Sequence, residues 1–452
     1  MASISRALER IKQDLGQLIP HLEVERICKD LNYQYRKRKL DPLTTIHLFV
    51  QQVLNYNTAI THLPHLSAMD FDPSAYCDAR RRLPLKVLQT LLRKIADAMR
   101  DQYNTRGLWL GHRTWLVDGS SCSMPDTPAL QAEFGQPPAQ KKGCGFPVAH
   151  LLGMFDAYSG MLMEMVACPL RTHDLSQVSL LHPLMQSGDV VVADRGFCSY
   201  VHLAMLFSRG IHAVFRVHQQ TIVKFRQSPE KRRNTKPAKG EPRSRMVQKL
   251  GEEDQIVQWY KPDKAPKWME QEEQQLKEFD KLPESLKLRE VRFCIRDKNC
   301  RTQVITLVTT LLDARKYSKS KLARLFKVRW RVEQDLKDLK TTLKMETLKC
   351  KTPDGVRKEL AVYALVYNLV CLVRQKGAEK QKVRPQRVSF IDVLRWLQVA
   401  HPGQPLPRFR VNPLRPRRHE PRAVKRRPKE YDRLNKPRAE YKKAQQSRAK
   451  EA

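Results

Sequence analysis

The sequence lacks several features that would assign it to a common class of protein. Its longest apolar run covers only residues 360–373 and contains Asn368, which is too short to span a bilayer. The N-terminus is charged and has no apolar core, so we expect no secretory signal. Ten cysteines are scattered without a C-x-x-C pair or a zinc-finger spacing. We therefore expect reduced thiols in a cytoplasmic protein, with neither disulfides nor a structural zinc site.

Acidic residues are far fewer than basic ones in this chain. The 452 residues include 84 Lys and Arg against 47 Asp and Glu, a formal net charge of +37. Such a surplus repels itself unless a polyanion offsets it, and nucleic acid is the leading candidate. A membrane surface is a weaker explanation, because the sequence has no obvious basic amphipathic helix with an aromatic face and no lipidation signal. The alternative is a basic protein without a polyanionic partner.

Changes in composition and in the spacing of apolar residues divide the chain into four parts. Residues 1–105 carry apolar residues at helical spacing and are predicted to form an all-helical domain. Residues 106–218 alternate strands and helices, which predicts a mixed α/β domain that continues over 315–400. The polar stretch 219–314, with strand-like runs in its second half, is predicted to be a β-rich insertion. Residues 401–452 are dense in Arg, Lys and Pro and are predicted to be a mostly extended arm.

Two of these parts carry candidate DNA contacts. The helical region contains the basic runs Tyr35–Lys39 and Arg80–Arg82, although a purely structural helical domain would look much the same. The C-terminal arm would gain order on DNA, or it would only solubilise the chain. Trp259 and Trp268 in the insertion could stack on an unpaired base, but ordinary packing is the better interpretation.

The stretch Lys321–Lys344 has neither Gly nor Pro and is predicted to be one helix with a buried apolar stripe. Phe326, Arg329, Glu333 and Lys340 fall beside that stripe within a sector of about 60°. One interpretation is a solvated face with an Arg–Glu pair. The other is that Glu333 binds a metal ion while Arg329 and Lys340 hold a phosphate backbone, which requires further carboxylates elsewhere.

Two candidate carboxylates follow short apolar runs. Asp118 ends the run in TWLVDG, and Asp194 ends the run in VVVADRGF, so each is predicted to lie where a strand leaves the sheet. A lone Asp at such a place is ordinarily a turn or cap residue. Together with Glu333, the two would form a cluster of like charges that needs compensating cations. Oxygen ligands suit Mg²⁺ or Mn²⁺.

The spacing Phe326-x-x-Arg329-x-x-x-Glu333-x-x-x-x-x-x-Lys340 resembles the Tyr-Arg-Glu-Lys signature of bacterial insertion-sequence DDE transposases of family four. VDGSS with Asp118 is similar to the first acidic motif of that family, and ADRGF with Asp194 is similar to the second. The long insertion before the glutamate also fits the family pattern. The resemblance spans nearly the whole chain.

The resemblance implies a ribonuclease-H-like core and a transposase that cleaves transposon ends and transfers the strand to target DNA. It implies two Mg²⁺ or Mn²⁺ ions, with Asp118 binding both and Asp194 and Glu333 each completing one site. Arg329, Lys340 and Phe326 would contact the DNA. A homodimer would join two inverted-repeat ends in a synaptic complex, and the enzyme would act in the bacterial cytoplasm, associated with the nucleoid.

The sequence departs from the signature at one position, where Phe326 replaces the tyrosine. The aromatic ring remains for packing or stacking, but the hydroxyl is absent. Two alternatives therefore stay open beside the active transposase. One is a transposase-derived DNA-binding protein that no longer cleaves, and the other is a ribonuclease-H-like nuclease that hydrolyses without joining ends.

Overall fold

The computed structural model describes most of the chain, with gaps. The described residues are 24–67, 69–102, 107–138, 140–172, 174–218, 221, 223–225, 244–270, 273–295, 303–400, 405–413 and 436–451. The first 23 residues of the predicted helical domain lie outside them, as does most of the basic C-terminal arm. Within the described part, no helix is long and apolar enough to cross a membrane.

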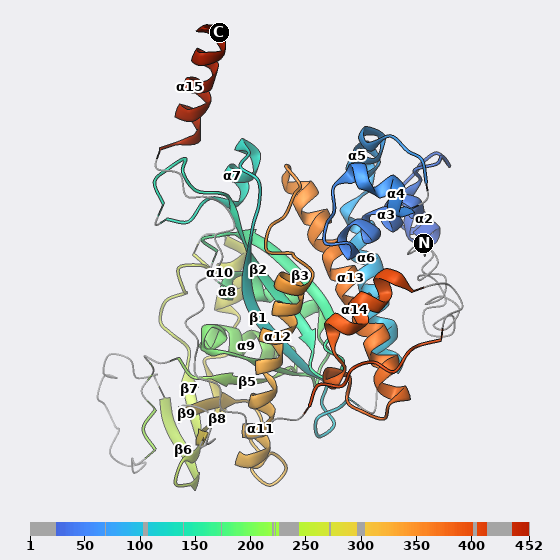
Figure 1. Ribbon diagram of the computed structural model, residues 1–452. Coiled ribbons are helices and arrows are strands. Elements are labelled where there is room, and N and C mark those ends of the chain that lie inside the picture. The colour runs from blue at the N-terminus through green and yellow to red at the C-terminus, as the bar shows by residue number, and fades with distance from the viewer. Residues whose placement is uncertain are drawn as a thin grey trace.

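A mixed sheet of nine strands runs through the molecule (Figure 1) in the order β3-β2-β1-β4-β5-β9-β8-β7-β6. The strands are β1 (Thr114–Ser123), β2 (Val148–Asp156), β3 (Leu162–Pro169), β4 (Val190–Ala193), β5 (His212–Arg216), β6 (Ser244–Gly251), β7 (Asp254–Tyr260), β8 (Ser285–Ile295) and β9 (Gln303–Thr309). β2 and β3 form a hairpin around Ser159 and Gly160, and Gly160 adopts a φ of 75° that favours glycine. The mixed α/β prediction is confirmed.

The centre of the sheet is parallel and buried on both sides. β1 pairs with β4, and β4 pairs with β5, in parallel register. Along β1, Leu116 belongs to the hydrophobic cluster on one face, while Trp115 and Val117 belong to the cluster on the other. Because side chains alternate along a strand, burial of both faces requires the continuous apolar run that the sequence shows.

Helices cover both faces and extend the core. The helices are α2 (Val24–Asp30), α3 (Pro42–Leu54), α4 (Leu63–Ser67), α5 (Pro73–Arg82), α6 (Leu85–Gln102), α7 (Pro128–Phe134), α8 (Asp174–Gln177), α9 (Tyr200–Ser208), α10 (Glu273–Asp280), α11 (Lys319–Val328), α12 (Trp330–Lys337), α13 (Pro353–Lys380), α14 (Phe390–Val399) and α15 (Arg438–Glu451). Short helical turns η1 (Ile60–His62), η2 (Val178–Leu184), η3 (Arg195–Phe197), η5 (Asp338–Thr342) and η6 (Pro385–Arg387) link them.

Helix α13 contains the apolar run 360–373, and it joins the sheet to the N-terminal helices. It packs against β3 on one side and against α3 and α6 on the other. Residues of α3, α6 and α13 belong to one hydrophobic cluster that also contains Leu116 of β1. The helical region is therefore packed onto the α/β core through a shared interior. The predicted boundary near residue 105 stays a prediction.

The insertion adds strands to the edge of the same sheet. β9 pairs antiparallel with β5, and β8, β7 and β6 follow outward. The structure also contains β6 and α10, in stretches where no strand or helix is predicted. Trp259 is 6% exposed and its Nε1 donates to Glu290 Oε1 at 2.9 Å, so its ring packs in the interior.

One part of the C-terminal segment is helical, where a mostly extended arm is predicted. Residues 438–451 form the helix α15, which projects away from the rest of the described structure (Figure 1). Arg438 anchors its base by pairing with Asp126 at 3.2 Å and by lying over the ring of Phe146 at 3.7 Å. Helix-forming Ala, Gln, Lys and Glu in this stretch explain the helix.

Candidate active site

Asp118 lies beside the end of the parallel pairing between β1 and β4. The expectation that its strand stops at the acid is wrong, since β1 continues to Ser123 by pairing with β2. The parallel pairing with β4, however, ends at Val117 opposite Ala193. The next residues on the two strands are Asp118 and Asp194. Parallel strands lie about 4.8 Å apart, so the register brings the two acids side by side.

Both acids are oriented by their own backbone. The N–H of Gly119 donates to Asp118 Oδ1 at 2.9 Å, and the N–H of Arg195 donates to Asp194 Oδ1 at 2.8 Å. Each side chain therefore holds one oxygen against its own backbone and turns the other, Oδ2, away from it. An Asp side chain readily accepts a hydrogen bond from a nearby backbone N–H, and here that local contact fixes the direction of both carboxylates.

The helix that carries Glu333 is interrupted, which corrects the prediction of one helix over 321–344. α11 ends at Val328, and α12 begins at Trp330. At the junction the N–H of Arg329 donates to Phe326 O at 3.1 Å, a tighter three-residue turn. The predicted apolar stripe is confirmed, because Leu325, Val332 and Leu336 are buried. α12 packs across β1 and so carries Glu333 to the two aspartates.

Arg329 lies among all three acids. Its Nη2 donates to Glu333 Oε1 at 3.1 Å and lies 4.0 Å from Asp194 Oδ2, while its Nη1 lies 3.7 Å from Asp118 Oδ2. The predicted Arg–Glu pair is present, but it belongs to a larger cluster. In this structure Arg329 is 7% exposed. It is thus an ionic partner of the acids and is not presented outward to a phosphate.

The electrostatics of this acid cluster, which we define as Asp118, Asp194 and Glu333, follow from burial and repulsion. Burial raises the pKa of Asp118 to about 6, while the Gly119 N–H and Arg329 lower it and the charges of Glu333 and Asp194 raise it. Three carboxylates around one guanidinium leave an excess of negative charge. The cluster is therefore suited to cations beyond the one it already holds.

The other two residues of the signature have distinct environments. Phe326 is 3% exposed and belongs to the hydrophobic cluster, with its ring centroid 5.7 Å from Cζ of Arg329. Its ring therefore packs in the interior. Lys340 lies in η5, a π-helical turn. A π-helix turns less per residue than an α-helix, so the expected alignment of Lys340 with Glu333 does not follow from helical geometry.

A histidine–aspartate pair that the sequence did not predict lies next to the acids. His150 on β2 and Asp174 on α8 are joined through Nε2 and Oδ1. A Cβ at Gly119 would lie 3.0 Å from Asp174 Oδ1, and one at Gly196 would lie 3.8 Å from Asp174 Oδ2. Asp174 thus lies against the chain segments that follow both aspartates. The glycines that closely follow Asp118 and Asp194 were the available signal, because glycine permits such close approach.

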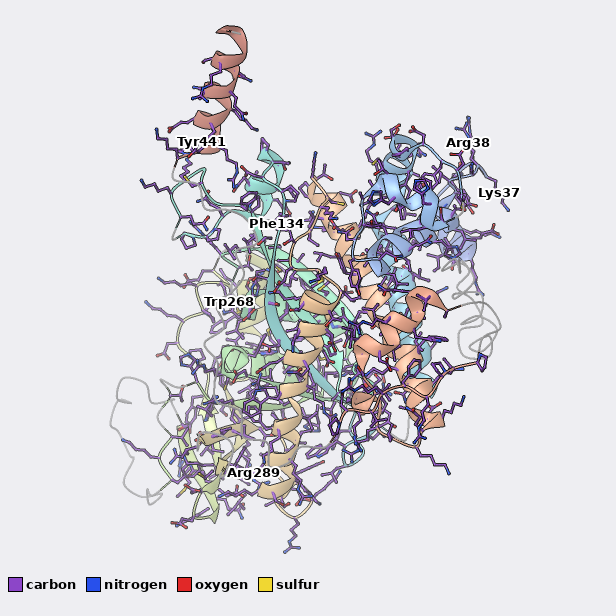
Figure 2. The ribbon with its side chains drawn as sticks, viewed as in Figure 1. Lys37, Arg38, Phe134, Trp268, Arg289 and Tyr441 are labelled. Carbon is purple, nitrogen blue, oxygen red and sulfur yellow. The ribbon has the colours of Figure 1, made fainter. Side chains whose placement is uncertain are left out.

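Of the predicted DNA contacts in the helical region, some are exposed and one packs against the protein. Figure 2 shows Lys37 and Arg38 at the outer edge of that region, both exposed. Arg80, by contrast, lies 3.8 Å over the ring of Phe49 and donates to Gln52 Oε1 at 3.2 Å. Of the second basic run, only Arg81 and Arg82 are exposed.

The donor set fits a divalent metal ion by its chemistry, although Arg329 stands between the donors. Carboxylate oxygens are the ligands that Mg²⁺ and Mn²⁺ take. As the described residues stand, no three His, Cys, Asp or Glu side chains lie close enough together to hold a metal ion. In the acid cluster, the outward oxygens instead surround a guanidinium.

Comparison with known proteins identifies the class. Residues 109–369 match the model of the family described as Transposase DDE domain. Because the match covers more than half of the chain and contains all three acids, the chain belongs to the DDE transposase family and is an enzyme of that family. Transposases of this kind generally use divalent metal ions and act on DNA.

Two individual transposases are similar to this chain. The chain is 25% identical over 382 residues to Transposase InsG for insertion sequence element IS4 of Escherichia coli (strain K12), a match covering 79% of this chain and 78% of that relative. The predicted membership of insertion-sequence family four is confirmed. The chain also aligns with a cryo-EM structure of a piggyBac transposase synaptic complex with hairpin DNA, at 11% identity and a TM-score of 0.39, over 84% of this chain and 77% of that chain. A TM-score of this size does not establish a common fold.

Proposed function

We propose that this transposase cleaves DNA at transposon ends and joins the freed 3′ end to target DNA by metal-dependent phosphoryl transfer. The observation that carries the proposal is the convergence of Asp118, Asp194 and Glu333, from three separate elements, on the guanidinium of Arg329. The parallel centre of the sheet, with the acids at the end of the β1–β4 pairing, supports a ribonuclease-H-like core.

The three acids would hold two divalent ions. Asp118, on the strand that pairs with β4 and contacts α12, would share both ions, with Asp194 and Glu333 each completing one site. Two such ions activate an attacking oxygen and stabilise the leaving oxygen of an in-line displacement. The backbone N–H groups of Gly119 and Arg195 keep the outward carboxylate oxygens in place, so the ligands are oriented before any ion binds.

The partners follow from charge and from the family. The excess of basic residues supports binding of double-stranded DNA at transposon ends and in the target. Exposed Lys37 and Arg38 (Figure 2) and the basic helix α15 are candidate contacts away from the acids. Joining two ends in one complex would require a homodimer. The enzyme would act on DNA in the bacterial cytoplasm.

The test is a cleavage and joining assay with the purified full chain and the DNA ends that flank its gene, in Mg²⁺ or Mn²⁺. We expect metal-dependent 3′-hydroxyl ends that join to target DNA. Glu333→Gln should lower this activity by about 10³-fold, because metal-ion stabilisation is worth several kcal/mol and each 1.36 kcal/mol is tenfold. DNA binding should remain.

The matched control is Glu278→Gln, an exposed glutamate on α10 in the insertion, which should leave the activity unchanged. Full strand joining by the Glu333→Gln variant would disprove the assignment of this site. Metal-dependent nicking without joining would point to the nuclease alternative, and binding without any cleavage would point to a DNA-binding protein that no longer acts as an enzyme.

A further inference from the structure

Arg329 holds the oxygens that a metal ion would need. Asp118 and Asp194 each have one oxygen bound to a backbone N–H, and the other oxygen of each, Oδ2, faces Arg329. Glu333 accepts a hydrogen bond from the same guanidinium at 3.1 Å. Since these are the outward-facing oxygens of the acid cluster, a metal ion and the guanidinium compete for them.

We propose that Arg329 is the resident counter-ion of the acid cluster, and that divalent metal ions displace it when they bind. The inference rests on the proposed function, because it assumes that these three acids are the metal ligands. It adds that the site is never left as three uncompensated carboxylates. Arginine suits this role because its guanidinium stays protonated at any pH the protein meets and its planar fork can contact several carboxylates at once.

The contacts are of the kind that can be exchanged. Only the contact to Glu333 is a hydrogen bond; those to Asp118 and Asp194 are longer ion pairs of 3.7 and 4.0 Å. One positive charge also falls short of three negative charges, so an ion of higher charge binds the cluster more strongly. The guanidinium therefore holds the three acids together without balancing their charge.

The structure also offers a place for the displaced side chain. The ring of Trp330 lies 6.0 Å from Cζ of Arg329, and Trp330 is 45% exposed. A guanidinium that leaves the acids can move toward this exposed ring, where a cation–π contact stabilises it. It would then lie at the surface next to the metal ions. Metal loading would thereby free Arg329 to contact the phosphate of bound DNA.

The experiment is a titration of the DNA-free full chain with Mn²⁺ by calorimetry, comparing the wild type with Arg329→Gln. Removal of the competing cation should tighten Mn²⁺ binding by about tenfold, as expected for one charge lost within 4 Å. The matched control is Arg324→Gln, the same change at an exposed position on α11. It should leave the affinity within about twofold of the wild type, since exposed charges are screened.

A second measurement follows the metal-free state. In EDTA, Arg329→Gln should unfold at a lower temperature than Arg324→Gln, because the three acids lose their counter-ion. Mn²⁺ should close that difference. If Arg329→Gln does not fold without metal, Arg329→Lys replaces it; the ammonium is a point charge that cannot span three carboxylates, so Mn²⁺ should bind several times more tightly than in the wild type.

The outcomes separate this inference from the proposed function. Asp118→Asn must lose Mn²⁺ binding if the acid cluster is the metal site; wild-type affinity in that variant would overturn the proposed function itself. If Asp118→Asn loses binding, but neither Arg329→Gln nor Arg329→Lys binds Mn²⁺ more tightly than the wild type, the site stands and the counter-ion role of Arg329 is wrong.

Discussion

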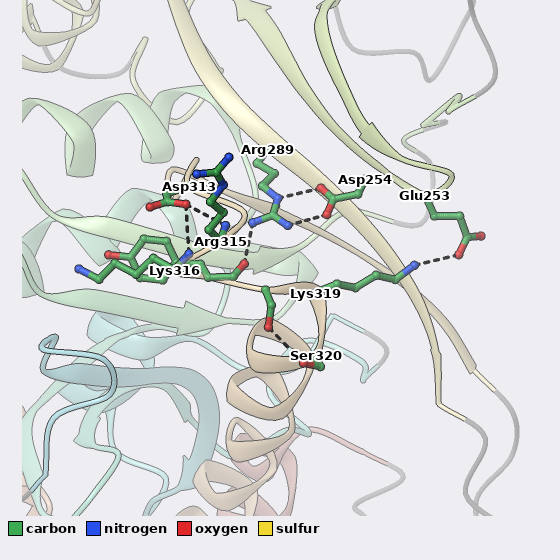
Figure 3. A network of polar contacts seen from close by, with 10 residues as sticks. Glu253, Asp254, Arg289, Asp313, Arg315, Lys316, Lys319 and Ser320 are labelled. Carbon is green, nitrogen blue, oxygen red and sulfur yellow. Dashed lines mark hydrogen bonds and ion pairs between the residues drawn. The ribbon is translucent and has the colours of Figure 1, made fainter.

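Two buried arginines in this protein have opposite electrostatic surroundings. Arg289 on β8 is 1% exposed, and its Nε and Nη2 donate to the two oxygens of Asp254 at 2.7 and 2.5 Å (Figure 3). Its Nη1 donates to the carbonyl of Tyr317 at 2.6 Å. Arg329 has three carboxylates around it, at 3.1 to 4.0 Å.

The difference distinguishes a structural ion pair from a candidate metal site. Arg289 has one carboxylate for one charge, with short bonds in a fork-to-fork geometry, and it ties β8 to the residues before α11. Arg329 has more acid around it than one charge can balance, and its contacts are mostly long. A surplus of buried or half-buried acid is costly in the folded state unless further cations bind. That surplus is the physical mark of the site.

The largest effect is expected from breaking the balanced pair. Arg289→Met leaves Asp254 without its partner and the Tyr317 carbonyl without its donor, so the free energy of unfolding should fall by about 3–5 kcal/mol. Urea unfolding measures it. Lys319→Gln is the control, since its pair with Glu253 in the same region (Figure 3) is about 40% exposed on both sides. That control should cost less than about 1 kcal/mol. Equal losses would contradict the contrast.

A second prediction concerns buried groups that are kept neutral. His182 and His202 stack at 5.2 Å with each ring 1% exposed, and burial lowers the pKa of His182 to about 2 and of His202 to about 4. Below pH 6.5 the unfolded chain binds protons that the folded chain does not. Stability should therefore be lost as the pH falls, by about 2 kcal/mol per histidine between pH 6.5 and 5.

The measurement is urea unfolding at the two pH values, for the wild type and His182→Phe. Phenylalanine keeps a flat ring in the stack and cannot be protonated, so the variant should lose less stability on acidification. An equal loss in both proteins would show that His182 does not contribute to the pH dependence.

A third prediction is that removing one acid from the acid cluster stabilises the fold, whereas removing one partner of an ion pair usually destabilises it. The folded-state pKa of Asp118 is about 6, above its ordinary value of 3.8. The fold therefore favours the protonated carboxyl, and the stability this gives at low pH is lost as the pH rises through 6 and the group ionises. At pH 8 in EDTA, Asp118→Asn should raise the free energy of unfolding by about 2 kcal/mol. Asp254→Asn, at the balanced pair, should lower it. If both Asp118→Asn and Asp254→Asn lowered the free energy of unfolding, the surroundings of Arg329 and Arg289 would not differ as argued.

The smallest effect is expected at Phe326. Phe326→Tyr restores the signature residue, but the hydroxyl would enter a buried position, which should cost about 1 kcal/mol of stability. Strand joining should change by less than about fivefold, equivalent to less than 1 kcal/mol, because the ring already packs in the core. Thermal unfolding and the joining assay measure the two effects. A large gain in joining would instead assign the missing hydroxyl a role in the reaction.

Much of the fold followed from periodicity. The apolar runs around Trp115, Val191 and Val214 predicted strands, and the stripe through Val332 and Leu336 predicted a helix with a buried face; the structure contains both. The end of β1 was misplaced because the strand continues beyond Asp118 as a pair with β2 alone, and local sequence does not reveal which neighbour a strand keeps. The break at Arg329 was missed because no Gly or Pro marks it.

The sequence by itself determined which chemical groups are available. These are two aspartates at the ends of predicted strands, a glutamate on a predicted helix with an arginine four residues before it, and a strong excess of positive charge. Those depend on residue types and short spacings, which are local. Only the tertiary structure decided that Asp118 and Asp194 end the same parallel pairing, and that Arg329 balances all three acids. Contacts between residues so far apart in the chain depend on strand register and on how α12 crosses the sheet, and packing of the whole core sets both.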